Sequence, residues 1–205
     1  MKSFIKIASV SAALIVAVAA QAQQASATAT ESSGLIGKRY VSATASYTDV
    51  HSSTWGLFDS NLTFNMPVLS NVDVGATYEY SWLEGHRKIN EQAPSVYATG
   101  YVTEGAFKPF ATFQLGYAWD RNPGFQSDNR AVYATQVGIE WSINKNLALT
   151  LSGNRTADFK SGDNSAYSGT LGLNIAVTKS VDVIIQGIWT ENATGGAGLG
   201  MAYKF

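Results

Sequence analysis

Cysteine is absent from all 205 residues of the sequence, and histidine occurs only twice. Without cysteine no disulfide can form, which excludes the small secreted folds that depend on disulfides. For the same reason we expect no lipid anchor attached at cysteine and no thiolate zinc site. The two histidines are not spaced as metal ligands, and no phosphate-binding loop or dinucleotide fingerprint occurs. We therefore expect neither a metal nor a cofactor.

Charge is also scarce. Charged residues make up 14% of the sequence, against roughly 25% in ordinary soluble domains. Without Lys2 and Lys6, which lie in a predicted signal peptide, 14 − 2 = 12 basic residues face 15 acidic ones, a net charge of −3. This balance argues against nucleic acid as a partner, because nucleic-acid binding depends on basic surfaces. Aromatic residues, at 12%, and 19 glycines are comparatively plentiful.

A long apolar run occurs only at the N-terminus. Lys2 and Lys6 precede an uncharged stretch, 7–20, and an A-x-A cleavage site ends at Ala22. These features predict a secretory signal peptide over residues 1–22. The run is shorter than the roughly 20 residues that a transmembrane helix needs. We therefore expect an exported chain that has no membrane-spanning helix.

Apolar and polar residues alternate through most of the remaining chain, which is the period of a β-strand. Residues 23–37 lack any period and predict a flexible periplasmic tail. Beyond them we expect ten strands, or eight if the second and fourth merge with their loops. The faces of the fourth strand are not assigned by its pattern, and Trp55 and Leu57 are out of phase with the rest of the second. The expected strands are about 38–48, 55–66, 72–82, 93–103, 111–119, 131–141, 147–156, 167–177, 181–190 and 196–205.

The last strand carries a family resemblance. Leu199, Met201, Tyr203 and Phe205 alternate with small or polar residues, and the chain ends on the aromatic ring. This ending resembles the C-terminal signature of small bacterial outer-membrane β-barrels of the porin-like or opacity-like kind. The resemblance implies an all-β fold, a closed antiparallel transmembrane β-barrel over residues 38–205, located in the bacterial outer membrane. It also implies that Tyr203 and Phe205 are read by the barrel-insertion machinery.

Aromatic residues gather near the expected strand ends, which is typical of the two girdles that flank a membrane-spanning barrel. Near the expected outer loops lie Tyr47, Trp82, Trp119, Tyr133, Tyr167 and Trp189. Near the opposite ends lie Phe64, Phe110, Trp141, Tyr203 and Phe205.

Polar residues in mid-strand should face the lumen, because polar groups exposed to lipid are costly. The candidates are Glu79, Gln114, Gln136, Glu140, Asn174 and Gln186. They could line a wet, mildly cation-preferring passage, or they could form a hydrogen-bonded network, paired with lysine or arginine, that fills the barrel. A small barrel encloses little free space, which favours the network.

The predicted function is therefore a non-enzymatic integral barrel, acting as a narrow porin-like channel or as a structural membrane protein. The alternative is an adhesion barrel that binds through two outer loops, Glu84–Gln92 and Asp120–Arg130. Outer-membrane lipid and lipopolysaccharide are the expected surroundings, and Arg155 with Lys160 could contact lipopolysaccharide phosphates near the outer strand ends. No oligomeric state is indicated.

A hydrolytic barrel enzyme is the less favoured interpretation. The Asp49-x-His51 spacing is similar to that of omptin proteases, and His51-x-Ser53 is similar to that of lipid A deacylases. The omptin pattern also requires a paired-aspartate segment, which is missing, and the deacylase pattern belongs late in a chain. His86 has no nucleophile nearby in the sequence. We expect no catalytic residue.

Overall fold

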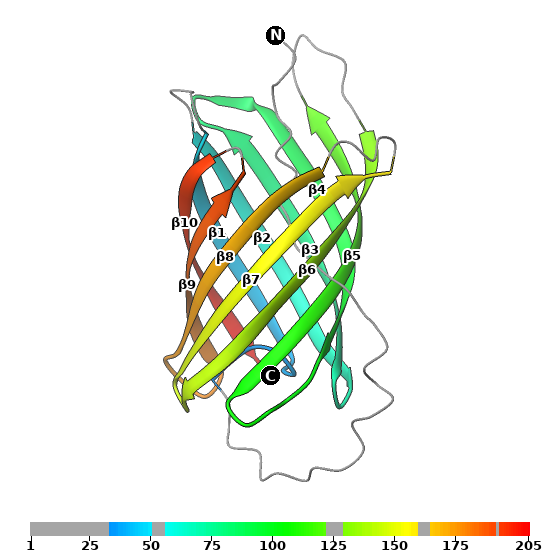
Figure 1. The fold of residues 1–205 in the computed structure, drawn as a ribbon. Helices are drawn as coiled ribbons and strands as arrows, with labels where there is room; N and C mark the ends of the chain where they lie inside the picture. The colour runs from blue at the N-terminus through cyan, green and yellow to red at the C-terminus, as the bar shows by residue number, and fades with distance from the viewer. Residues whose placement is uncertain (1–32, 51–55, 122–128, 160–164, 192) are drawn as a thin grey trace.

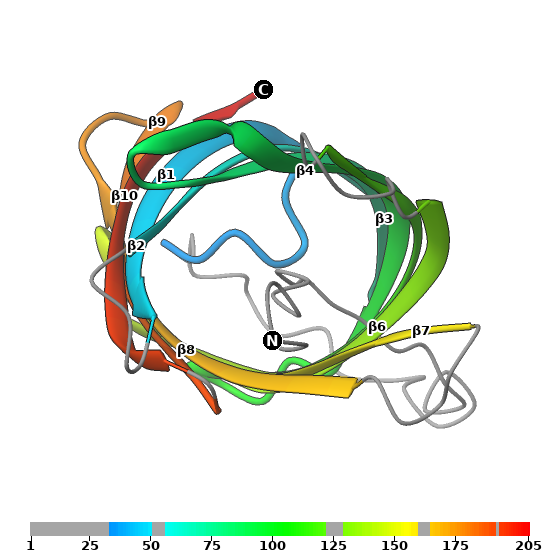
Figure 2. The same cartoon turned by 90° about the horizontal axis from the view of Figure 1, so that it is seen from above.

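The computed structural model describes residues 33–50, 56–121, 129–159, 165–191 and 193–205. They form ten antiparallel strands in a closed barrel, in which each strand pairs with its neighbours in the sequence. Figure 1 shows the strands slanting around the barrel axis, and Figure 2 shows the closed ring from above. The prediction of ten strands is confirmed, and the eight-strand alternative is wrong. The strands are β1 Tyr40–Val50, β2 Gly56–Leu69, β3 Val72–Leu83, β4 His86–Tyr101, β5 Phe107–Arg121, β6 Asn129–Asn144, β7 Leu147–Asp158, β8 Ser165–Ala176, β9 Val181–Thr190 and β10 Ala193–Lys204.

Pairing between the first and last strands closes the barrel. Tyr40 lies opposite Lys204, and the register continues to Thr48 opposite Gly196. The amide of Phe205 adds a hydrogen bond of 3.2 Å to the carbonyl of Arg39. Closure leaves no sheet edge with unpaired backbone N–H and C=O groups. Such groups would find no hydrogen-bond partner in hydrocarbon. Among the described residues no helix is long and apolar enough to cross a membrane.

The two ends of the barrel differ. We call the end where β1 begins and β10 finishes the terminal end, and the opposite one the loop end (Figure 1). The two longest connections, 122–128 and 159–164, join strands at the loop end. Turns at the terminal end include the two-residue connections 70–71 and 145–146. Outer-membrane barrels have short periplasmic turns and longer extracellular loops, so the loop end faces outward.

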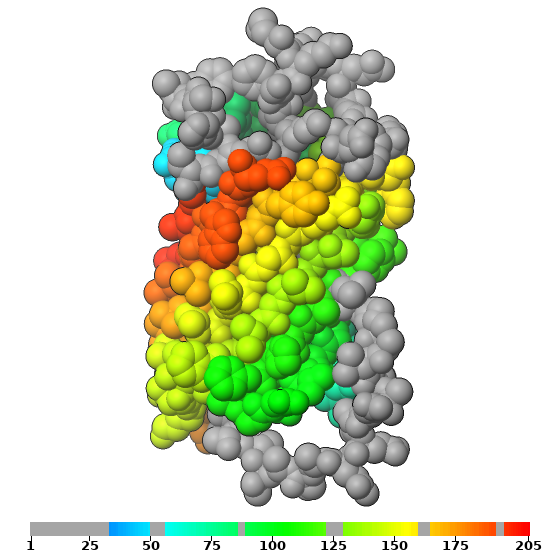
Figure 3. Space-filling view, viewed as in Figure 1, coloured from blue at the N-terminus to red at the C-terminus, as the bar shows by residue number. Residues whose placement is uncertain are grey.

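The alternation of apolar and polar residues along the strands gives the barrel an apolar outer wall and a polar interior. In β1, Ser42 and Thr48 are buried inside while Val41 is exposed on the outer wall. The face in Figure 3 is a continuous wall of packed side chains. Large apolar residues stay exposed all around this wall, which would be unfavourable in water and suits hydrocarbon. Examples are Leu62, Val96, Leu115, Val137, Leu151, Leu171, Ile185 and Leu199.

The structure corrects the predicted loops. Most of Glu84–Gln92 is strand, because β4 begins at His86 after a two-residue turn. Gly85 makes that turn possible, since its φ of +71° is in the left-handed region that glycine adopts readily. Part of Asp120–Arg130 is also strand, because β5 continues to Arg121 and β6 begins at Asn129. The loop surface expected for adhesion is accordingly smaller.

Three large side chains that point into the lumen account for the ambiguous faces of the second and fourth strands and for one wrongly placed girdle residue. Leu57 points inward and is 5% exposed, which accounts for its phase in β2. Tyr101 is likewise buried in the lumen, so β4 carries large residues on both faces. Phe110, expected in a girdle, also points inward: its ring lies over Gly138, where an added Cβ would be 2.6 Å from the ring. The glycine opposite makes room for the ring inside.

Candidate lumenal site

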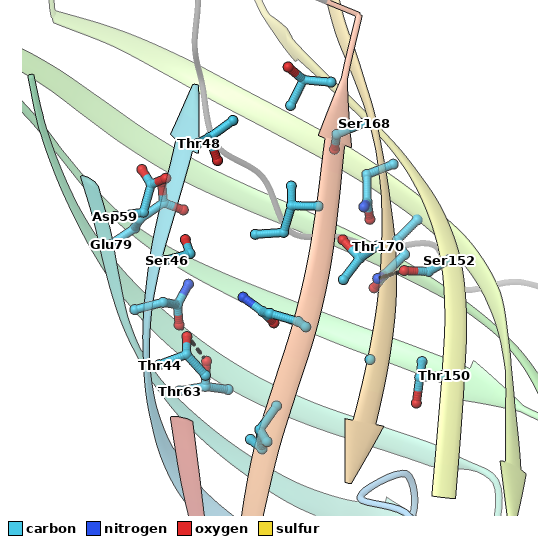
Figure 4. A pocket seen from close by; sticks show the side chains of 18 of the residues that line it. Thr44, Ser46, Thr48, Asp59, Thr63, Glu79, Thr150, Ser152, Ser168 and Thr170 are labelled. Atoms are coloured by element: carbon cyan, nitrogen blue, oxygen red, sulfur yellow. Dashed lines mark hydrogen bonds between the residues drawn. The ribbon is translucent and has the colours of Figure 1, made fainter. Parts of the chain in front are cut away.

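A cavity of about 300 Å³ occupies the lumen. Its walls come from seven strands, β1, β2, β3, β6, β7, β8 and β9, and most of its lining side chains are hydroxyls and amides. Because successive residues point to opposite faces, these groups come from alternate, inward-facing positions along the strands. Figure 4 shows several of them converging on the same space: Thr44, Ser46, Thr63, Thr150, Ser152 and Thr170.

The charged residues lining this cavity are acidic. Asp59 and Glu79 lie side by side on the wall formed by β2 and β3 (Figure 4). Ser81 Oγ donates to Asp59 Oδ1 at 2.6 Å and lies 3.2 Å from Glu79 Oε1. Within the part of the chain that the structure describes, no lysine or arginine lines the cavity. The described lining of the cavity is therefore acidic.

Four of the six predicted lumenal residues line the cavity: Glu79, Gln136, Asn174 and Gln186. Gln136 Nε2 donates to Ser152 Oγ at 2.8 Å across the wall between β6 and β7. Gln114 lies away from the cavity and donates to Ser95 Oγ at 2.5 Å. Glu140, at 1% exposed, is buried at the terminal end.

At the terminal end the chain folds into its own barrel. Residues 33–39, which we call the plug, lie within the ring of strands in Figure 2. Glu140 Oε2 accepts hydrogen bonds from the amides of Leu35 at 2.8 Å and Ile36 at 3.3 Å. Lys108 Nζ lies 3.6 Å from Glu140 Oε1 and donates to the carbonyl of Ile36 at 2.8 Å. One buried carboxylate on β6 thus fastens the plug to the barrel wall.

A second carboxylate fastens the plug on the other side. Asp73 Oδ2 accepts from the amide of Gly37 at 2.8 Å and from Asn65 Nδ2 at 3.0 Å. Asn65 Nδ2 also donates to the carbonyl of Lys38 at 2.8 Å. Burial lowers the pKa of Lys38, and the like charges of Lys204 and Lys108 lower it further. The plug therefore lies in a crowded cluster of paired charges.

No periodicity in the sequence indicated these plug contacts. Ser33–Gly37 is the end of the segment expected to be a flexible tail, and residues 23–32 lie outside the described residues. Ser33 Oγ donates to the carbonyl of Asn144 at 2.9 Å and is 1% exposed. A signal was present in hindsight, since Gly34 and Gly37 are the residues that allow close approach. A Cβ at Gly34 would overlap the Glu140 carboxylate, and Gly37 has a φ of +81°.

Two more ion networks hold lumenal charges away from the cavity. Near the loop end, Arg130 donates to Glu91 Oε2 and to Asp120 Oδ2, each at 2.6 Å. At the terminal end, Lys204 Nζ donates to Asp182 Oδ1 at 2.5 Å. Paired charges therefore lie near the ends of the lumen, and the polar cavity lies between them.

Eleven residues were predicted for the aromatic girdles, and one of them, Phe110, points inward. Eight others have the strand parity of the outer wall: Tyr47, Trp82, Trp119, Tyr133, Trp141, Tyr167, Trp189 and Tyr203. At the loop end, Phe58 packs between Tyr47 and Trp82, with ring centroids at 4.9 and 5.4 Å. At the terminal end, Phe205 lies 6.2 Å from Tyr203. Aromatic clusters therefore border the apolar wall at both ends.

Most residues of the two hydrolase patterns lie outside the described part of the chain. His51, the residue on which both hydrolase resemblances depend, lies outside the described residues, and His86 begins β4. Among the described residues, no cluster of three or more histidine, aspartate or glutamate side chains could hold a metal ion.

The comparisons with known proteins give distant structural likenesses. No family model and no curated protein matches the sequence. Among solved structures, the NanC porin is 8% identical with a TM-score of 0.47, covering 80% of this chain and all of its own. The KdgM porin in complex with disordered oligogalacturonate is 10% identical, with a TM-score of 0.46 and coverages of 81% and 99%. The N-terminal β-barrel domain of Pseudomonas aeruginosa OprF is 12% identical, with a TM-score of 0.45 and coverages of 82% and 98%.

The barrel's own surface determines where the protein belongs. A closed barrel of even strand number, with an apolar outer wall, aromatic borders and a polar interior, is the architecture of bacterial outer-membrane proteins. The predicted resemblance to small barrels of that membrane is confirmed, and the protein is located there.

Proposed function

We propose that the protein is a non-enzymatic, porin-like barrel whose lumen is a narrow passage for cations and small uncharged polar solutes. The observation that supports this function is the cavity of about 300 Å³ lined by hydroxyls and amides. A barrel that served only as a membrane anchor would be more stable with its interior filled, because empty or wet space forfeits packing contacts.

The chemistry of the lining favours particular solutes. Hydroxyl and amide groups both donate and accept hydrogen bonds, so they can replace part of the hydration of a polar solute or cation. Asp59 and Glu79 place carboxylates on the described lining, which favours cations over anions. The plug restricts the terminal end, so large solutes are excluded.

Single-channel recording in planar bilayers tests this proposal with the refolded chain. We expect small current steps and a preference for potassium over chloride. Glu79→Gln should reduce that preference, because it removes one of the two carboxylates from the wall. Glu104→Gln is the matched control: it removes the same charge from an exposed position at the terminal end, away from the cavity, and should leave selectivity unchanged.

Glu140→Ala removes a carboxylate that holds the plug. If neither the wild type nor this variant conducts current, the protein is a structural barrel instead. The surface-binding alternative would depend on Glu84–Gln92 and Asp120–Arg130. Most of the first segment is strand, and residues 122–128 of the second lie outside the described part of the chain.

A further inference from the structure

We infer that the outer wall carries a binding groove for a phosphate-bearing lipid of the outer leaflet, of the lipopolysaccharide class. The groove has a volume of about 470 Å³ and lies over β6, β7, β8 and β9. Two neighbouring rows of outward-facing residues form it. The row nearer the loop end is Thr135, Arg155 and Tyr167. In the row beneath it, Val137, Gly153 and Trp189 line the groove, and Gly169 lies in register between the last two.

Gly153 creates the hollow. A Cβ placed on Gly153 would meet no atom within 4 Å, so this position is an open floor. Its neighbour Gly169 is covered instead by the indole of Trp189, which an added Cβ would overlap. Val137 and Trp189 therefore border a gap one residue wide in an otherwise apolar wall.

Arg155 supplies the charge at the top of the hollow. Its guanidinium lies 6.0 Å from the centroid of the Tyr167 ring, which fixes its position by a cation–π contact. Its Nε is buried and has no hydrogen-bond partner among the described residues. A guanidinium with an unsatisfied donor is costly, so this group gains when an anion from outside the chain neutralises its charge.

The depth of Arg155 indicates what that acceptor is. The residue lies near the loop end of β7, beside Tyr167 and Trp189 of the aromatic border. A cation at this level reaches the lipid headgroups rather than the hydrocarbon. Arginine pairs well with phosphate through its fixed set of N–H donors. Glu191 also borders the groove, but it is exposed to solvent, which screens its charge.

The wall below the hollow suits an acyl chain. Leu151 and Leu171 pair in the next row down and are 48% and 44% exposed. A lipid with its phosphate at Arg155 would therefore lay a chain across Gly153 and over these leucines. Because the loop end faces outward, the ligand belongs to the outer leaflet, where lipid A carries both phosphate and acyl chains.

Titration of the refolded, lipid-free barrel with phosphorylated lipid A, followed by native mass spectrometry, tests the site. Arg155→Gln should weaken binding about tenfold or more, the value of a charge-assisted contact. Gly153→Leu should weaken it similarly by filling the hollow. Arg39→Gln is the charge control, because Arg39 lies 6.0 Å from the Phe205 ring at the opposite end. Gly100→Leu is the filling control, since its Cβ position on β4 is also open.

Three further results would decide the matter. Lipid A stripped of its phosphates should bind the wild type as weakly as phosphorylated lipid A binds Arg155→Gln. Phosphatidylglycerol, an anionic lipid with a different headgroup, should not displace lipid A at equal concentration. The inference is overturned if Arg155→Gln binds normally, if Arg39→Gln loses as much affinity, or if phosphatidylglycerol competes equally. Circular dichroism of each variant establishes that the barrel has folded.

Discussion

At the scale of single residues, the guanidinium of Arg130 holds two carboxylates on the lumen wall. Its Nη2 lies 2.6 Å from Glu91 Oε2 and its Nη1 2.6 Å from Asp120 Oδ2. The side chains are 10%, 5% and 23% exposed, so the group is largely removed from water. Removing one partner of such a group leaves an uncompensated buried charge, whereas removing all the charges together is often neutral.

Arg130→Met should therefore lower the free energy of unfolding by about 3–5 kcal/mol, because it leaves Glu91 and Asp120 without their cation. The triple variant Glu91→Gln, Asp120→Asn, Arg130→Met should recover most of that loss. Urea unfolding in detergent micelles, followed by tryptophan fluorescence, measures both. If the triple variant is as unstable as the single one, the loss of stability comes from the packing of the arginine's aliphatic stem and not from its charge.

At the scale of elements, the ten strands could be predicted and the plug could not. A strand's two faces are a local property, so alternation such as that of Val72–Leu83 shows directly in the sequence. The plug depends on partners far away in the chain: Gly37 and Asp73 are 36 residues apart, and Leu35 and Glu140 are 105 apart. On the plug side, most of its hydrogen bonds use backbone amides and carbonyls, which leave no pattern in residue type.

The same reasoning explains the candidate site. Glu79, Gln136, Asn174 and Gln186 could be assigned to the lumen because a polar residue among apolar neighbours of opposite parity has one favourable face. Whether such residues face open space or one another depends on how the other strands fill the interior. Glu140 illustrates this: the sequence places it inside, and only the fold brings the plug to it.

Unfastening the plug should enlarge the passage. Glu140→Ala removes the acceptor for two plug amides, and Gly34→Val should displace the same carboxylate from the plug side, because a Cβ there overlaps it. We expect both variants to raise single-channel conductance severalfold with little change in the circular-dichroism spectrum. Gly100→Val, at an open position on the outer wall, is the control. Unchanged conductance in both plug variants would mean that the restriction lies elsewhere in the lumen.

At the scale of the whole molecule, one division organises the chain: every strand separates a lipid side from a lumen side. The apolar wall, the aromatic borders and the polar cavity are three consequences of the same alternation around a closed ring. The cavity proposed to conduct lies inside the ring, and the hollow at Gly153 interrupts its outer wall. Neighbouring residues in one strand should therefore respond oppositely to the same substitution.

Leu171 and Thr170, midway along β8, provide that test. Leu171 is exposed on the outer wall, and Thr170 lines the cavity. Leu171→Arg should lower the free energy of unfolding in lipid vesicles by about 2–4 kcal/mol, because a cation at the bilayer midplane costs that much. Thr170→Arg should cost much less, because water in the lumen can solvate the charge, and it should weaken the preference for cations. Urea unfolding in vesicles measures the two costs, and Leu171→Ala separates lost apolar contact from added charge. Equal costs at the two positions would contradict both the orientation of β8 and the membrane placement of the barrel.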